Sequence, residues 1–133
     1  MRKLARESAF KIIYKSHFLK DNFDTTEILD EDGITLKEDI DFVNLLVDLY
    51  RQNRKEIDEK IETKSNGFEF DRIYKIDLAI LELALAEILY FKQTPFKVVV
   101  NEAVEMSKKY STQKSYSFVN GILKSVIEEE NVV

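Results

Sequence analysis

The chain has 133 residues, of which 44% are hydrophobic and 34% charged, so it fits one globular domain and leaves no room for a second sizeable core. Three glycines and one proline are too few for a β-sandwich or barrel, and the absence of cysteine together with a single histidine, His17, excludes disulfides and the usual zinc sites. The net charge of −5 does not suit a uniformly basic nucleic-acid binder, but it conceals +5 over residues 1–20 and −9 over residues 21–70.

The helical period predicts one helix over residues 3–20. On a wheel of about 100° per residue, one stripe is formed by Ala5, Ala9, Ile12, Ser16 and Leu19. His17 falls on the flank of this helix, away from the stripe, where we expect a surface or interface residue rather than a catalytic base.

The acidic segment that follows predicts two further helices. Residues 25–31 are expected to form a short helix capped by a threonine, with Gly33 as its stop signal. Thr35 and Glu38 match a capping box, which opens a long helix with apolar residues at helical spacing and a kink near Asn53.

The second half of the chain predicts a central helix and two more after it. Asp71 is expected to cap a short helix that leads into the strongly apolar residues 77–91, and so apolar a helix must be covered by neighbours on several sides. Pro95 starts the next helix, and the last helix covers residues 116–130. Because no segment alternates as a strand does, the sequence predicts an all-α, compact helical domain of about seven helices, with residues 1–133 as a single domain.

The chain lacks the motifs on which catalysis and cofactor binding usually depend. It has no Walker loop, no dinucleotide-binding glycine pattern, no nucleophile elbow and no zinc-protease motif. Its carboxylates lie mostly in runs typical of solvated surface, so we expect no catalytic residue, no metal and no cofactor, and a binding module rather than an enzyme. No apolar run approaches 18 residues and no signal peptide is evident, which indicates a cytoplasmic protein without a membrane partner.

The first helix also carries a second apolar stripe, formed by Phe10, Tyr14 and Phe18 at positions i, i+4 and i+8. A surface helix needs only one buried face, so this stripe has two explanations. Either the helix is sandwiched inside the fold, or the stripe is an exposed aromatic strip for a protein partner, since aromatic residues are enriched at interfaces. The sequence does not choose between them.

Basic and aromatic residues alternate in two places. They are Arg2, Lys3 and Arg6 at the N-terminus, and Lys114, Tyr116 and Phe118 around a polar loop. Single-stranded RNA is bound by this combination, with cations on phosphates and rings stacked on unpaired bases. The competing explanations are a solvated basic helix face for the N-terminal arm and a core position for Phe118.

Several segments carry a recognisable pattern. They are RKLARESAF at residues 2–10, DRIYKIDLAILELALAEIL at residues 71–89, PFKVVVNEAVEMSKKYS at residues 95–111 and SFVNGIL at residues 117–123. Together they extend over nearly the whole chain, and in this order the sequence closely resembles the NusB family of bacterial transcription antitermination factors.

The resemblance implies a non-catalytic, all-helical protein built from two packed three-helix halves. It implies pairing with NusE, a small-subunit ribosomal protein, and joint binding of single-stranded boxA RNA in nascent ribosomal RNA leaders. The complex joins the elongating RNA polymerase with other Nus factors and suppresses premature termination. The sequence leaves open whether two copies of the chain form a homodimer.

Carried over residue by residue, the resemblance assigns two surfaces to this chain. The RNA-binding residues fall on Arg2, Lys3 and Arg6 of the arm, on Phe118, and on the loop before it with Lys114 and Tyr116. The NusE-facing residues fall on Tyr14, Phe18 and Asp77.

Two positions depart from the family pattern. Leu4 stands where many relatives place arginine, which thins the arm. Glu82 stands where relatives often carry arginine, which removes a phosphate contact that Lys114 is expected to replace.

Two other interpretations compete with an antitermination factor: a stand-alone relative of the RNA-binding domain of RNA cytosine methyltransferases, and a helical oligomerisation protein without RNA.

Three residues of the resembling segments are expected to serve packing. At least one of Asn101 and Glu102 is predicted to point inward, with its polar atoms satisfied at a neighbouring helix end. Gly121 interrupts the last helix at a cost of about 1 kcal/mol relative to alanine, which predicts a close helix–helix approach there.

Overall fold

The computed structural model describes residues 2–20, 22–65 and 69–130, and within these ranges every regular element is a helix. The α-helices are α1 (Arg2–Leu19), α2 (Thr25–Glu31), α3 (Lys37–Gln52), α4 (Arg54–Lys64), α5 (Lys75–Ala86), α6 (Phe96–Tyr110) and α7 (Ser115–Glu130). Two short elements flank α5: the 3₁₀ turn η1 (Phe70–Arg72) and the π-helical turn η2 (Glu87–Phe91). The predicted all-α fold is confirmed.

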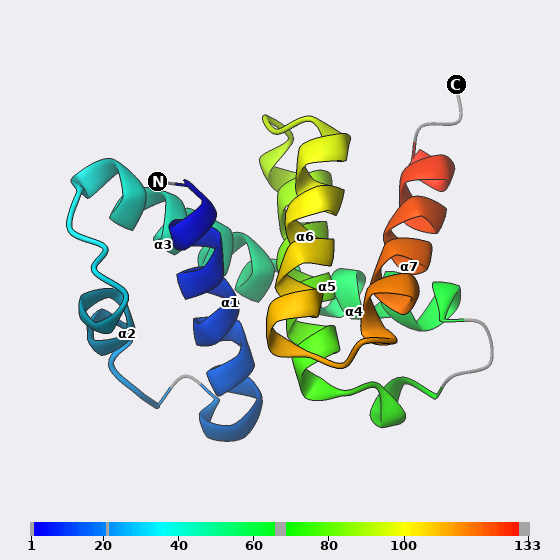
Figure 1. Ribbon diagram of the computed structural model, residues 1–133, viewed down its shortest axis with the longest axis horizontal. Helices are drawn as coiled ribbons and strands as arrows, with labels where there is room; N and C mark the ends of the chain where they lie inside the picture. Colours follow the sequence, from blue (N-terminus) through cyan, green and yellow to red (C-terminus); the bar gives the residue numbers. More distant parts are fainter. Residues whose placement is uncertain (1, 21, 66–68, 131–133) are drawn as a thin grey trace.

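The helices form two groups that meet at α5 (Figure 1). Helices α1, α2 and α3 lie on one side and α6 and α7 on the other, while α5 contacts α1, α3, α4, α6 and α7. Among the described residues, no helix combines the length and the apolar character needed to cross a membrane.

The sequence of α5 explains its central position. Residues 77–88 are all buried, whereas an amphipathic surface helix buries only one face. Small side chains such as Ala79 and Ala84 lie between large ones such as Leu81 and Leu85, so neighbouring helices pack closely on every side. The prediction that this helix is covered from several directions is confirmed.

Three acidic residues are buried in this otherwise apolar segment, namely Asp77, Glu82 and Glu87. They are five residues apart, so each points about 140° away from the one before it. Buried carboxylates need specific partners, and each of the three has one. Helix α5 and the turn η2 that follows it therefore carry three buried acidic residues, each with a polar partner.

Glu87, which follows the last residue of α5, is paired with Arg6 of α1. The guanidinium donates from Nε to Glu87 Oε1 at 2.9 Å and from Nη2 to Oε2 at 2.7 Å, and Thr94 Oγ1 donates to Oε2 at 2.6 Å. Burial by itself lowers the pKa of Arg6, but the bonds to Glu87 outweigh it and raise that pKa, so the guanidinium stays charged. This bidentate pair joins α1 to the end of α5.

Glu82 meets residues of α1, α3 and α4. His17 Nε2 lies 2.5 Å from Glu82 Oε1, and the Tyr50 hydroxyl donates to Oε2 at 3.2 Å. The expectation that His17 is a surface residue is wrong, because its side chain is only 5% exposed and closes over Glu82. Glu82 is 0% exposed, so its side chain does not reach the surface on which RNA would lie. The expectation that glutamate at this position removes a phosphate contact is therefore also wrong.

The helix ends differ from the prediction in the residues that cap them. Asp24 rather than a threonine caps α2, accepting from the Thr26 backbone N–H at 3.0 Å. The predicted capping box is wrong, since α3 begins after Leu36 without a side-chain cap. At Asn53 the chain breaks into two helices, and its side-chain amide donates to the Leu49 carbonyl at 2.8 Å.

Asn101 and Gly121 both lie on outer helix faces. The buried stripe of α6 contains Val99, Ala103 and Met106, which leaves Asn101 exposed and Glu102 half-buried. A Cβ at Gly121 would meet no atom within 4 Å. The prediction of a close helix approach at Gly121 is therefore wrong, and of the two polar residues Asn101 faces outward while Glu102 is partly buried.

Replacing Gly121 by alanine is expected to raise the free energy of unfolding by about 1 kcal/mol, because the helix gains a better helix former and nothing obstructs the methyl group. Chemical denaturation measures this difference. Gly33→Ala is the matched control, since Gly33 has a φ of 72° and alanine there is strained and destabilising. A Gly121→Ala protein no more stable than the wild type would contradict the open position.

Candidate nucleic-acid and partner interface

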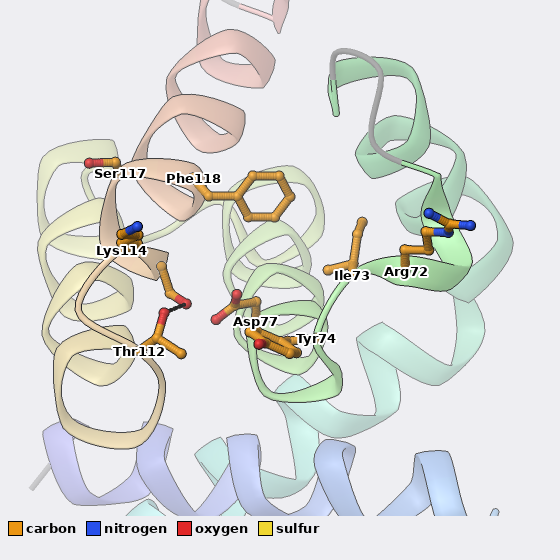
Figure 2. Close-up of a pocket in the computed structure, with 9 residues that line it drawn as sticks. Arg72, Ile73, Tyr74, Asp77, Thr112, Lys114, Ser117 and Phe118 are labelled. Atoms are coloured by element: carbon orange, nitrogen blue, oxygen red, sulfur yellow. Dashed lines mark hydrogen bonds between the residues drawn. The ribbon is translucent and has the colours of Figure 1, made fainter.

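A pocket of about 710 Å³ opens between the segment that leads into α5 and the start of α7 (Figure 2). This volume lies within the range of small-molecule sites. Its walls are formed by Arg72, Ile73, Tyr74, Asp77, Thr112, Lys114, Ser115, Ser117 and Phe118. The pocket thus combines aromatic and aliphatic walls with two cationic side chains and one carboxyl group.

The carboxyl group belongs to Asp77, which is only 4% exposed and lies in the first turn of α5. Ser111 Oγ donates to Asp77 Oδ1 at 2.6 Å. Ser111 and Ser115 share a hydrogen bond of 2.9 Å, and Thr112 and Ser115 share one of 2.8 Å, drawn in Figure 2. These hydroxyl groups fix the position of the carboxyl group on the pocket wall.

The Phe118 ring projects from α7 into the space above Asp77 and Tyr74 (Figure 2). The ring is half-buried, because the core line of α7 runs through Val119, Ile122, Leu123 and Val126 instead. The core explanation for Phe118 is thus only partly correct, and one part of its surface faces the pocket.

Lys114 and Tyr116 are both exposed, but only Lys114 lines the pocket. Tyr116 lies on the side of α7 toward α6, where Lys108 Nζ is 5.1 Å from its ring centroid. Of the predicted RNA residues near the loop, the structure therefore brings Lys114 and Phe118 to one pocket and places Tyr116 outside it.

A second pocket, of about 430 Å³, adjoins the first. It is lined by Tyr14, Phe18, Tyr74, Lys75, Ile76, Tyr110, Ser111 and Thr112, so Tyr74 and Thr112 belong to both pockets. Phe18 is 60% exposed and Tyr74 is 63% exposed. Two of the predicted partner residues, Tyr14 and Phe18, line this pocket, whereas Asp77 lies in the first pocket with Phe118.

The aromatic strip of α1 is buried at one end and exposed at the other. Phe10 is buried, with its ring centroid 5.1 Å from that of Tyr110 on α6. The Tyr14 ring lies 6.2 Å from Phe10 and 5.1 Å from Phe18. Both sequence explanations therefore hold in part, since Phe10 serves the core and Phe18 reaches the surface.

The basic arm is held against the body of the protein. Arg6 is buried in its pair with Glu87, so the expectation that it offers its charge to RNA on an exposed arm is wrong. The Arg2 guanidinium lies 4.2 Å from the ring centroid of Phe42, within cation–π range, and Lys3 is exposed. Lys11 pairs with Asp32 at 2.7 Å, so a further part of the positive charge of residues 1–20 is neutralised within the fold.

Sequence reasoning missed Tyr74, Arg72 and Ser111 as members of these pockets. Arg72 and Tyr74 fall in the short helix predicted after Asp71, and Ser111 begins the predicted polar loop, so no apolar period marks any of the three. The one sequence signal for Tyr74 is that a large aromatic side chain shortly precedes the buried residues 77–88 and so lies at the edge of the core.

Known proteins resemble this chain in sequence and in structure. A NusB family model matches residues 3–128. The transcription antitermination protein NusB of Natranaerobius thermophilus is 39% identical over 136 aligned residues, covering 98% of this chain and 96% of that protein. NusB of T. maritima has a TM-score of 0.86 at 30% identity, covering 97% of this chain and 92% of that one. A chain in the crystal structure of antitermination factors NusB and NusE in complex with dsRNA has a TM-score of 0.87 at 29% identity, covering 96% of both chains.

Proposed function

The chain belongs to the NusB family of transcription antitermination proteins, which are not enzymes, and from this we propose that it pairs with NusE and binds boxA-type single-stranded RNA. The pair acts in the cytoplasm, on nascent ribosomal RNA leaders, within an elongating RNA polymerase complex that contains other Nus factors.

The pocket with Phe118 carries the RNA part of this proposal. A half-buried ring faces an open space, and Lys114 lies beside it. Stacking on aromatic rings and cations near the phosphates is how proteins bind unpaired nucleotides. Tyr116 extends the surface on which RNA is expected to lie, and Lys3 offers a separate exposed cation near the start of α1, whereas Arg6 supports the fold.

The pocket with Tyr14 and Phe18 carries the partner part. Exposed aromatic side chains are favoured at interface centres, and Phe18 and Tyr74 are large and mostly exposed. A relative of similar structure has been crystallised with NusE and dsRNA, which supports NusE as the protein partner.

One titration tests both parts. Fluorescently labelled boxA RNA is titrated with this chain, with and without NusE, as a single strand and as a duplex with its complement. We expect tight binding of the single strand when NusE is present and weaker binding by either protein alone. Equal affinity for the duplex, or no effect of NusE, would contradict the proposal.

Phe118→Ala is expected to weaken binding of the single strand about tenfold, or about 1.4 kcal/mol, by loss of base stacking. NusE association should be unchanged, because Phe118 does not line the second pocket. Fluorescence anisotropy measures the affinity, and Phe96→Ala, which removes an exposed ring elsewhere, is the control. A large drop in melting temperature with unaltered RNA affinity would overturn the assignment.

Phe18→Asp is expected to weaken NusE association by at least about tenfold, because it places a charge in the apolar centre of the contact. The fold should be retained, since Phe18 is 60% exposed. Isothermal titration calorimetry measures the change. Leu45→Asp on α3 introduces the same charge at another exposed apolar position, and an equal effect of both substitutions would show that only net charge matters.

A further inference from the structure

We propose that the pocket beneath Phe118 accepts one unpaired RNA base that carries an exocyclic amino group, with the Asp77 carboxylate as the acceptor for that group. The inference rests on the proposed function as an RNA-binding protein and adds selectivity for base identity. Cytosine, adenine and guanine carry such a group, and uracil does not.

The walls of the pocket suit a flat, partly apolar group. Phe118 and Ile73 provide the apolar surfaces, and Tyr74 stands at the border with the second pocket. The pocket volume of about 710 Å³ is larger than the volume of a single side chain and falls within the range of small-molecule sites. A base stacked on Phe118 from the open side would place one of its edges toward α5.

Asp77 gives that edge its selectivity. The carboxyl group is 4% exposed yet lines the pocket, and the Ser111 hydroxyl donates to Oδ1 at 2.6 Å. A carboxylate accepts several hydrogen bonds but donates none, so it favours an amino group and disfavours a carbonyl. Cytosine presents an amino group where uracil presents a carbonyl oxygen, and carboxylates accept from that cytosine amine in known complexes.

The charge of the rim distinguishes RNA from the other group that a buried carboxylate could attract, a cationic side chain of a protein partner. Lys114 and Arg72 stand at the pocket, and they repel an incoming lysine or arginine. The same two cations attract the phosphates on either side of an inserted base. Arg72 is paired only loosely, at 3.5 Å from exposed Glu69, and such a surface pair is weak.

The test compares short labelled oligouridines that differ at one central position. Each is titrated with the full chain in the presence of NusE, alongside boxA RNA, by fluorescence anisotropy. We expect the oligonucleotides with one cytidine, adenosine or guanosine to bind about tenfold tighter than the all-uridine strand, the effect of one hydrogen bond to a charged group. Asp77→Asn is expected to abolish this preference, because an amide donates as well as accepts.

Asp71→Asn is the matched control, since Asp71 is an exposed acid on η1 outside the pocket and its loss should leave the preference intact. If boxA RNA binds but base identity has no effect, the pocket inference fails and the proposed function stands. If no RNA binds, the proposed function itself fails. If Asp77→Asn weakens NusE association and leaves base preference unchanged, the pocket belongs to the protein partner and the inference is overturned.

A second measurement uses the wild-type protein and does not depend on the stability of a variant. An oligouridine with one 5-iodocytidine is irradiated in the complex, and the crosslinked peptide is identified by mass spectrometry. We expect the crosslink on Phe118 or Tyr74. A crosslink confined to other residues would overturn the assignment of the base to this pocket.

Discussion

Arg6→Ala is expected to lower the free energy of unfolding by about 3–5 kcal/mol, although the residue lies in the basic arm. Glu87 is only 1% exposed, and without Arg6 its charge remains buried with Thr94 as its one other described hydrogen-bond partner. The loss also separates α1 from the end of α5, which Arg6 and Glu87 join across 81 positions of sequence. Urea denaturation followed by circular dichroism measures the change.

Lys3→Ala is the control for this experiment, since Lys3 is an exposed cation on the same helix and its removal should change stability by less than about 0.5 kcal/mol. Replacing Arg6 and Glu87 together by leucine removes both charges, and the double variant should be more stable than Arg6→Ala alone. Equal stability of Arg6→Ala and Lys3→Ala would contradict a structural role for the pair.

The free energy of unfolding is expected to fall by up to about 2 kcal/mol between pH 6.5 and 8, and the cause is the acid pair Asp58 and Glu82. Asp58 Oδ1 is buried and has no hydrogen-bond partner, which leaves a proton shared with the neighbouring Glu82 as the means of satisfying it. Burial, then the bond and the charge of Glu82, raise the pKa of Asp58 to about 8. Burial also raises the pKa of Glu82.

The sign follows from where the protons are bound. The folded protein keeps a proton on Asp58 up to about pH 8, whereas the unfolded chain releases it near its ordinary pKa of 3.8, so stability falls as pH rises between these values. Burial, Arg54 and Lys75 lower the pKa of His17 to about 4 from 6.5, so below pH 6.5 His17 has the opposite effect. The fall is therefore clearest from pH 6.5 to 8.

Asp58→Asn tests this account, because asparagine cannot titrate and its amide donates to Glu82 in place of the shared proton. The variant should show a flatter dependence of stability on pH over this range, measured by urea denaturation at several pH values. Glu59→Gln changes an exposed acid on the same helix and should preserve the wild-type slope. An identical slope in Asp58→Asn and wild type would exclude the acid pair as its origin.

Local patterns in the sequence predict the helices well because the apolar period reports which face each helix buries. The central position of α5 follows from it directly, whereas the limits of α2 follow from the cap and stop signals at its two ends. The polar contacts between helices do not follow. His17 and Glu82 are 65 residues apart, far beyond the distance over which the period of a single helix relates residues. Taken alone, each looks like a surface residue. Only the packing of α1 against α5 brings them together and buries them.

The candidate site was predictable to a similar extent. Four residues stand out because their aromatic or basic side chains interrupt an expected pattern, namely Phe118, Lys114, Tyr14 and Phe18. Tyr74 was not identified because its importance depends on the two pockets meeting at one residue. Arg6 was misplaced because a basic arm and a buried ion pair have the same sequence signature.

Tyr74 and Thr112 form a wall common to both pockets, and Ser111, which holds Asp77, lines the second. A ligand that reorients this wall in one pocket alters the free energy of filling the other. Such thermodynamic coupling is reciprocal, so the factor by which a bound protein tightens RNA binding equals the factor by which RNA tightens protein binding. For the proposed complex, a wall of side chains common to both pockets would make the assembly of this chain, its protein partner and RNA cooperative.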